Sequence, residues 1–160
     1  MVKAMYEQSK CAVVDGSGSY DWFDVTTGVK HGCCMSGFFF LPVIDWVMRR
    51  TIEGRRTGIR WQFANKLEDL AFADDVALVA SRIVDMQTKA ENLNINRKTT
   101  GLKIKFGKTV VMKWNVNPGI KIQLEGRDME EVEKFVYLSA TVTTTGGAGE
   151  DISARLGEAH

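Results

Sequence analysis

Two adjacent aspartates stand at the centre of an apolar segment, and this feature restricts how the chain can fold. In "LEDLAFADDVALVAS", residues 67–81, four apolar residues precede Asp74 and five follow Asp75. Neighbouring carboxylates repel each other and prefer water, whereas the flanking residues favour burial. A hairpin resolves the conflict, because the turn can expose the acids while the strands are covered. We therefore expect antiparallel strands over 67–73 and 76–80, with both acids at the tip.

Two interpretations of this hairpin tip are open. Aspartate is common in turns, so turn chemistry alone explains the pair if nothing else accompanies it. Alternatively, both side chains reach one concave site, where a divalent cation balances their charge and other oxygen ligands complete its shell. Two such ions about 4 Å apart promote phosphoryl transfer, because they clamp the attacking and leaving oxygens.

The composition is that of a globular protein. The 160 residues suit one domain or part of a larger one, and 44% hydrophobic residues are enough for a core. A net charge of +1 neither requires nor excludes a nucleic-acid partner. Three cysteines, two of them adjacent, imply no disulfide framework and favour an intracellular protein, in the nucleus or the cytoplasm. Pro42 and Asp45 interrupt the longest apolar run, so we expect no membrane span.

Turn signals and hydrophobic periodicity predict an α+β fold class, with an antiparallel sheet and helices packed on one face. Residues 10–28 read as a hairpin around a Gly/Ser turn. Ser36 is expected to cap a helix that runs to about Arg50 and is buried around most of its circumference. An amphipathic helix from Arg82 to about Thr100 should end at Gly101. Further strands are expected over 58–64, 66–73, 76–81, 102–106, 109–114, 119–126 and 134–142, and a final helix from Glu150.

Four segments match, in order, the motifs of one protein family. "FADD", residues 72–75, is similar to an [FY]-x-DD metal-binding hairpin. "TGVKHGCCMSGFFFLPVIDWVMRR", residues 27–50, resembles a "GVRQGC-x-LSP-x-LF" loop and helix, and "GLKIKFGKT", residues 101–109, resembles "GLKIN-x-KKT". "FVYLSATV", residues 135–142, resembles the primer-gripping hairpin "F-x-YLG". Together they resemble the reverse transcriptases of retrotransposons without long terminal repeats, along nearly the whole chain.

This resemblance implies a polymerase palm and gives roles to single residues. Asp74 would be the principal Mg²⁺ ligand of the hairpin and Asp75 would assist, while Phe72 would pack beneath the primer–template end. Lys108 matches a lysine near the nucleotide phosphates, where a cation neutralises or protonates the leaving pyrophosphate. Asp74, Asp75 and Lys108 thus form the expected catalytic set. The other positions implied for nucleotide or template binding are Gly28, His31, Gly32 and Ser36.

Simpler explanations exist for several of these positions. Lys108 can be a solvated turn lysine, and the two glycines can be ordinary loop residues. The arginine-rich segment 49–60 can face phosphates, although a solvated loop explains most of its charge. Three tryptophans could stack on bases, but we expect core packing for Trp46, Trp61 and Trp114.

Departures from the family pattern bear on activity. The polymerase site also needs an aspartate on a strand well before the glycine loop, and we expect this chain to lack it. Asp15 lies in a Gly/Ser turn only thirteen positions before Gly28, so it does not count. Pro42 falls inside the expected helix, at a cost of about 3 kcal/mol or a kink. Other departures are His31 for Gln, Gly37 for Pro, Ala71 for Asp, Phe106 for Asn and Ser139 for Gly.

The sequence therefore predicts a palm fragment without the first catalytic strand, most of the fingers and the thumb. The ancestral reaction is templated DNA synthesis by two-metal nucleotidyl transfer. Its partners are an RNA template, a DNA primer, dNTPs and the remaining segments of a larger polyprotein. We expect this chain alone to be inactive. Two alternatives remain: a non-catalytic palm remnant that binds nucleic acid, and a decayed open reading frame whose product folds poorly.

Overall fold

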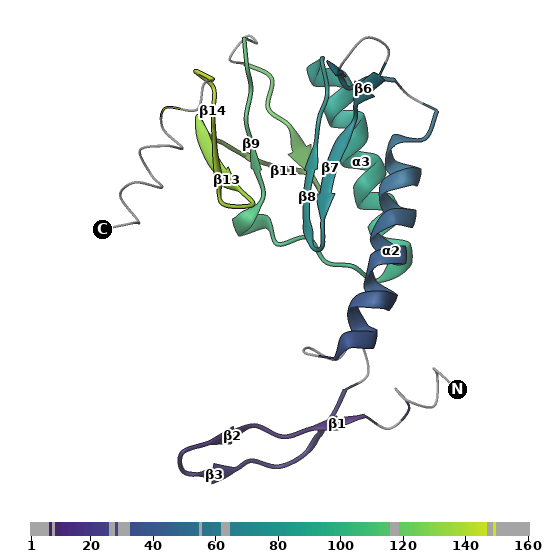
Figure 1. The fold of residues 1–160 in the computed structure, drawn as a ribbon, viewed down its shortest axis with the longest axis vertical. Helices are drawn as coiled ribbons and strands as arrows, with labels where there is room; N and C mark the ends of the chain where they lie inside the picture. The colour runs from purple at the N-terminus through teal and green to yellow at the C-terminus, as the bar shows by residue number, and fades with distance from the viewer. Residues whose placement is uncertain are drawn as a thin grey trace. The chain divides into compact units, whose positions relative to one another are not determined.

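The structure of the chain is a computed structural model. It describes residues 7, 9–25, 28, 33–54, 56–61, 65–115, 119–146 and 149. Within these residues, two α-helices accompany a set of short β-strands (Figure 1). The predicted mixed α+β class is therefore confirmed. The chain divides into two compact units, residues 1–40 and 41–160, and each is described by itself.

A β-hairpin occupies the first unit. Its outer ladder pairs β1 (Lys10–Cys11) with β4 (Phe23–Asp24), and its inner ladder pairs β2 (Val14–Asp15) with β3 (Gly18–Ser19). Asp15 fixes the turn, because its carboxylate accepts hydrogen bonds from the Ser17 amide at 2.8 Å and the Tyr20 hydroxyl at 3.0 Å. The hydrogen bonds from Ser17, followed by that from Tyr20, lower the pKa of Asp15. The predicted hairpin is confirmed, with Asp15 in a structural role.

Helix α2 (Cys34–Ile52) begins three residues earlier than a cap at Ser36 predicts. Ser36 therefore lies in its first turn, where the Ser36 amide donates to the Cys33 carbonyl at 3.0 Å, and the predicted N-cap position is wrong. Pro42 lies inside the continuous helix and is exposed. Since its ring has no N–H, the helix lacks one hydrogen bond there.

Among the described side chains of α2, burial is limited to Ser36 in the first turn and a short stripe near the end. Val47, Met48 and Thr51 are buried, whereas the Phe38 side chain is 75% exposed. The Thr51 hydroxyl donates to the Val47 carbonyl at 2.7 Å, which satisfies a polar group in the covered stripe. The predicted burial around most of the circumference is therefore wrong for the chain as described.

The strands of the second unit pair two by two. Antiparallel ladders join β5 to β6, β7 to β8, β10 to β11 and β13 to β14, and a parallel ladder joins β9 to β12. The described residues therefore form separate two-stranded ladders, and the single sheet that we predicted is not among them. The bounds are β5 Ile59–Trp61, β6 Asn65–Leu67, β7 Asp69–Phe72, β8 Asp75–Leu78, β9 Val110–Val111, β10 Gln123–Leu124, β11 Arg127–Asp128, β12 Glu130–Glu131, β13 Lys134–Tyr137 and β14 Ala140–Thr143.

Helix α3 (Ile83–Thr100), shown in Figure 1, contributes Ala90 to the hydrophobic core of this unit. It ends as predicted at Gly101, whose φ of 75° lies in the left-handed region that glycine adopts freely. The buried cluster consists of Ala90 from α3 with Ile122, Leu124 and Met129 from the β10–β11 region. Partly buried side chains complete it: Ile83, Met86, Ile104, Phe106 and Val111.

Several local predictions need correction. The segment predicted as a strand over 102–106 has no regular structure until the short 3₁₀ helix η1 (Phe106–Lys108). Trp46, Trp61 and Trp114 are all exposed, so the core packing predicted for them is wrong. The helix predicted from Glu150 lies outside the described residues. Neither α2 nor α3 is sufficiently long and apolar to span a bilayer.

Candidate functional site

The acid pair lies at the apex of the β7–β8 hairpin. Phe72 and Asp75 form the closing pair of the ladder, and the two-residue turn between them consists of Ala73 and Asp74. This arrangement matches the hairpin predicted from the sequence. Ala73 has a φ of 52°, in the left-handed region, which costs a residue with a Cβ roughly 1–2 kcal/mol. Such strain is often found at functional sites.

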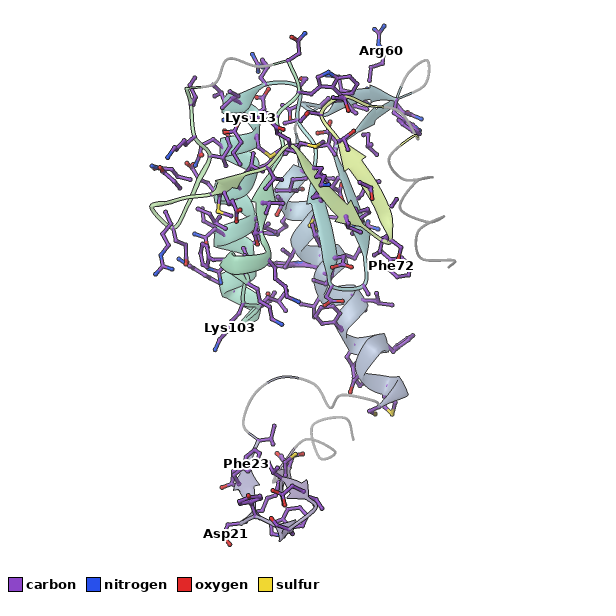
Figure 2. All side chains as sticks on the ribbon, turned by 90° about the vertical axis from the view of Figure 1, so that its left-hand side faces the viewer. Asp21, Phe23, Arg60, Phe72, Lys103 and Lys113 are labelled. Atoms are coloured by element: carbon purple, nitrogen blue, oxygen red, sulfur yellow. The ribbon has the colours of Figure 1, made fainter. Side chains whose placement is uncertain are left out.

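The apex projects into solvent. Asp74 and Asp75 are both exposed, and Phe72 is 63% exposed. Figure 2 labels the Phe72 side chain at the surface of the second unit. Phe72 and Asp75 share one face of the ladder, because cross-strand partners point to the same side. The apex therefore offers a carboxylate and an aromatic ring on one face, with a second carboxylate in the turn.

A tyrosine from another hairpin lies near the acid pair. Tyr137 ends β13 and pairs with Ala140, and the turn between them has φ of 48° at Leu138 and 66° at Ser139. Burial raises the pKa of Tyr137, and the charges of Asp75 and Asp69 raise it further. The phenol is therefore close enough to both carboxylates to feel their charge. Tyr137 lies in the segment that resembles the "F-x-YLG" motif, but nothing in the sequence predicted that this tyrosine would lie near the acids.

Asp69 does not extend the acid pair into a cluster. It begins β7, and the ladder register places it on the face opposite Asp75. Its pKa is raised, because burial outweighs the opposing charge of Lys89 and Glu68 adds a like charge. Asp69 therefore affects the electrostatics near the hairpin without joining its apex.

A buried ion pair holds the base of the hairpin. The Lys89 side chain of α3 is fully buried, and its ammonium donates to Glu68 Oε2 at 2.6 Å and to the Glu68 carbonyl at 3.0 Å. It also donates to the Val79 carbonyl at the end of the second strand. Burial acts to raise the pKa of Glu68, but the hydrogen bond and charge of Lys89, together with backbone hydrogen bonds from Gly58 and Thr57, outweigh it and the pKa is lowered. One cation therefore connects α3 to both strands of the hairpin.

Sequence reasoning missed Lys89, although a signal was present. Lys89 lies three residues after Met86 and next to Ala90, on the stripe predicted to face the core. A lysine at such a position needs a carboxylate or carbonyl partner inside the protein. The helical pattern could therefore have predicted that Lys89 is buried, but it could not have predicted that Glu68 and Val79 are its partners.

The other predicted residues are not gathered at the apex by any described contact. Lys108 is exposed in η1, and its side chain has no ion-pair partner among the described residues. Gly28 and Ser36 belong to the first unit, whereas the acid pair belongs to the second. Gly28 has a φ of 90°, so the backbone there favours glycine. His31 and Gly32 lie outside the described residues.

A metal ion at the apex would use few protein ligands. Across the described ranges, no group of three or more His, Cys, Asp or Glu side chains is placed to hold one. Asp74 and Asp75 provide two carboxylates, and Mg²⁺ commonly completes such a shell with waters and substrate phosphates. The donor set therefore fits a cation that is shared with a phosphate-bearing ligand.

Comparisons with known proteins assign no family to the chain. No model of a protein family matches it, and a search of curated proteins finds no match. The candidate site therefore depends on the residues and their geometry.

Proposed function

We propose that the chain is part of the palm of a retrotransposon reverse transcriptase, the enzyme class that copies RNA into DNA. The acid pair at the exposed apex of the β7–β8 hairpin carries this proposal. Solubility alone explains exposed acids. It does not explain why two adjacent carboxylates, a strained turn and an exposed aromatic ring occur together at one hairpin apex. The "FADD" motif and the order of the four motifs support the same assignment.

Each apex residue has a role in this proposal. Asp74 and Asp75 hold Mg²⁺, which supplies Lewis acidity and positive charge for phosphoryl transfer. The Phe72 ring is exposed on the face of Asp75 and supports the primer–template end. Lys108 neutralises nucleotide phosphate charge. Lys89 is a positioning residue, because it joins both strands of the hairpin to α3.

The isolated chain is proposed to be inactive in DNA synthesis. The described residues provide two carboxylates at the apex, and a two-metal reaction needs a further one to bridge the ions. A primer-extension assay with Mg²⁺, an RNA template and dNTPs tests this. We expect no incorporation above that of an Asp74→Ala control, and incorporation clearly above the control contradicts the proposed inactivity.

Metal binding at the apex is tested without catalysis. Binding of Mn²⁺ removes its free-ion signal in electron paramagnetic resonance. We expect the chain to bind Mn²⁺ and the Asp74→Asn/Asp75→Asn variant to lose that site. The matched control is Asp21→Asn/Asp24→Asn, which removes the same charge from exposed positions. Equal Mn²⁺ binding by all three proteins would contradict a metal site at the apex.

A second function, nucleic-acid binding without catalysis, is favoured by unpaired lysines after α3. The third possibility, a decayed and poorly folded product, is supported by apolar side chains left exposed, such as Phe38 and Trp114. Cooperative thermal unfolding of the chain would contradict it.

A further inference from the structure

The segment that follows the middle of α3 is strongly asymmetric in charge. Residues 92–124 contain seven lysines and arginines and no aspartate or glutamate. Acidic residues outside the segment neutralise four of the seven. The pairs are Arg97–Glu125 at 2.6 Å, Lys98–Glu125 at 3.0 Å, Lys113–Glu131 at 2.7 Å and Lys121–Asp128 at 3.0 Å.

Three lysines of the segment are left without a carboxylate. Lys103, Lys105 and Lys108 are exposed, and none forms an ion pair with any residue that the structure describes. Lys103 and Lys105 alternate with Ile104 and Phe106, which pack against the core. Because exposed and core-packed residues alternate over 103–106, Lys103 and Lys105 both lie on the solvent side of this segment.

An arginine from strand β11 adds a third cation beside these two lysines. The Arg127 guanidinium of β11 lies 5.2 Å from the centroid of the Phe106 ring. The ring orients the guanidinium without neutralising its charge. Arg127 forms no ion pair within the described part of the chain. We refer to Lys103, Lys105 and Arg127 as the cationic strip, and Lys108 is kept apart because the proposed function already uses it.

We propose that the cationic strip binds the phosphate backbone of single-stranded nucleic acid. Repeated unpaired cations match repeated phosphates, and an exposed aromatic ring can stack on a base. Phe72 is such a ring, exposed at the apex of the β7–β8 hairpin in the same unit. The choice of nucleic acid over another polyanion rests on the proposed function. The strip itself needs no metal.

The experiment measures binding of the 160-residue chain to a fluorescent 12-nucleotide single-stranded RNA and to its DNA counterpart. Anisotropy titrations are run in EDTA over a series of salt concentrations, so the acid pair and its metal do not contribute. Each phosphate contact on a single strand adds about 0.7 to the slope of log K against log salt. We expect Lys103→Gln/Lys105→Gln to lower the magnitude of that slope by about 1.4.

A matched variant separates local contact from net charge. Lys98→Gln/Lys121→Gln removes the same two charges from exposed lysines that are already ion-paired. We expect this control, and the conservative variant Lys103→Arg/Lys105→Arg, to keep the slope of the unmodified chain.

Four results would overturn the inference. They are no binding by the unmodified chain, an unchanged slope in Lys103→Gln/Lys105→Gln, the same reduction in both glutamine variants, and tighter binding to phosphatidylserine vesicles than to either oligonucleotide. None of them affects the Mn²⁺ test, because that measurement depends on Asp74 and Asp75. Failure of the strip and failure of the proposed metal site are therefore distinguishable.

Discussion

Lys89 joins the hairpin that carries the acid pair to helix α3. Its ammonium is fully buried and contacts both strands of the hairpin, five residues or fewer from the apex. A buried cation is tolerated only when its partners remain. Glu68 is its only charged partner within the described residues, so substitution of Glu68 should affect both stability and hairpin geometry.

We predict that Glu68→Gln lowers the free energy of unfolding by about 3–5 kcal/mol at pH 7, because it leaves the Lys89 charge buried without a counter-ion. The folded pKa of Glu68 lies below its unfolded value of about 4.3. The stabilisation is therefore complete above that pH and is lost as the pH falls through the folded pKa. The difference between the variant and the unmodified chain should shrink in acid, as measured by urea unfolding from pH 3 to 7.

The double variant Glu68→Gln/Lys89→Met provides the control. It removes the buried charge together with its partner, so it should be more stable at pH 7 than Glu68→Gln alone. If the double variant is as unstable as the two single substitutions combined, the two side chains act independently. The positioning role that we give to Lys89 would then be wrong.

At the scale of single elements, the β13–β14 hairpin connects a sequence departure to a backbone conformation. Ser139 stands where the "F-x-YLG" motif has glycine, and its φ is 66°. Leu138 has a φ of 48°, so both turn residues lie in the left-handed region. A two-residue turn of this kind follows the twist of the strands, but its conformation favours glycine or asparagine.

We predict that Ser139→Gly stabilises the chain by up to about 1 kcal/mol, because relief of the left-handed strain exceeds the entropic cost of glycine. Ala140→Gly, at the first residue of β14, is the matched control and should destabilise by about 0.5–1 kcal/mol. Thermal unfolding of both variants checks the prediction. A loss of stability in Ser139→Gly would show that the Ser139 side chain contributes more than its backbone strain costs.

Local elements were the part of the fold that the sequence predicted well. Gly101 marked the end of α3, the Gly/Ser turn after Asp15 marked the first hairpin, and the acids at 74 and 75 marked the second. Each depends on residues within a few positions of one another, so turn chemistry and periodicity were sufficient. For the candidate site, the same reasoning located the apex.

Long-range pairing was not predictable in this way. The parallel ladder between β9 and β12 joins segments about twenty residues apart. The residue pattern of neither strand indicates which strand it will pair with. The partners of Lys89 are Glu68, just before β7 and twenty-one positions away, and Val79, just after β8 and ten positions away. Trp61 and Trp114 look like core residues by type, yet their exposure depends on whether another segment covers them.

The two units of the chain differ in how they bury side chains. Every strand residue of the β1–β4 hairpin in the first unit is exposed. In the second unit, α3 buries Lys89 and Ala90, and the β13–β14 hairpin buries Thr143. A two-stranded hairpin without a covered face has only marginal stability in water. A helix with buried residues unfolds only when the core around it unfolds.

We therefore predict that the whole molecule opens unevenly in amide hydrogen exchange measured by mass spectrometry. Peptides from residues 10–24 should exchange nearly as fast as an unstructured chain, because only their own ladder protects them. Peptides from residues 83–100 should exchange slowest, and those from 134–143 should be intermediate because that hairpin is only partly covered. Slow exchange of residues 10–24, equal to that of α3, would mean that their hairpin is protected by more than its own ladder.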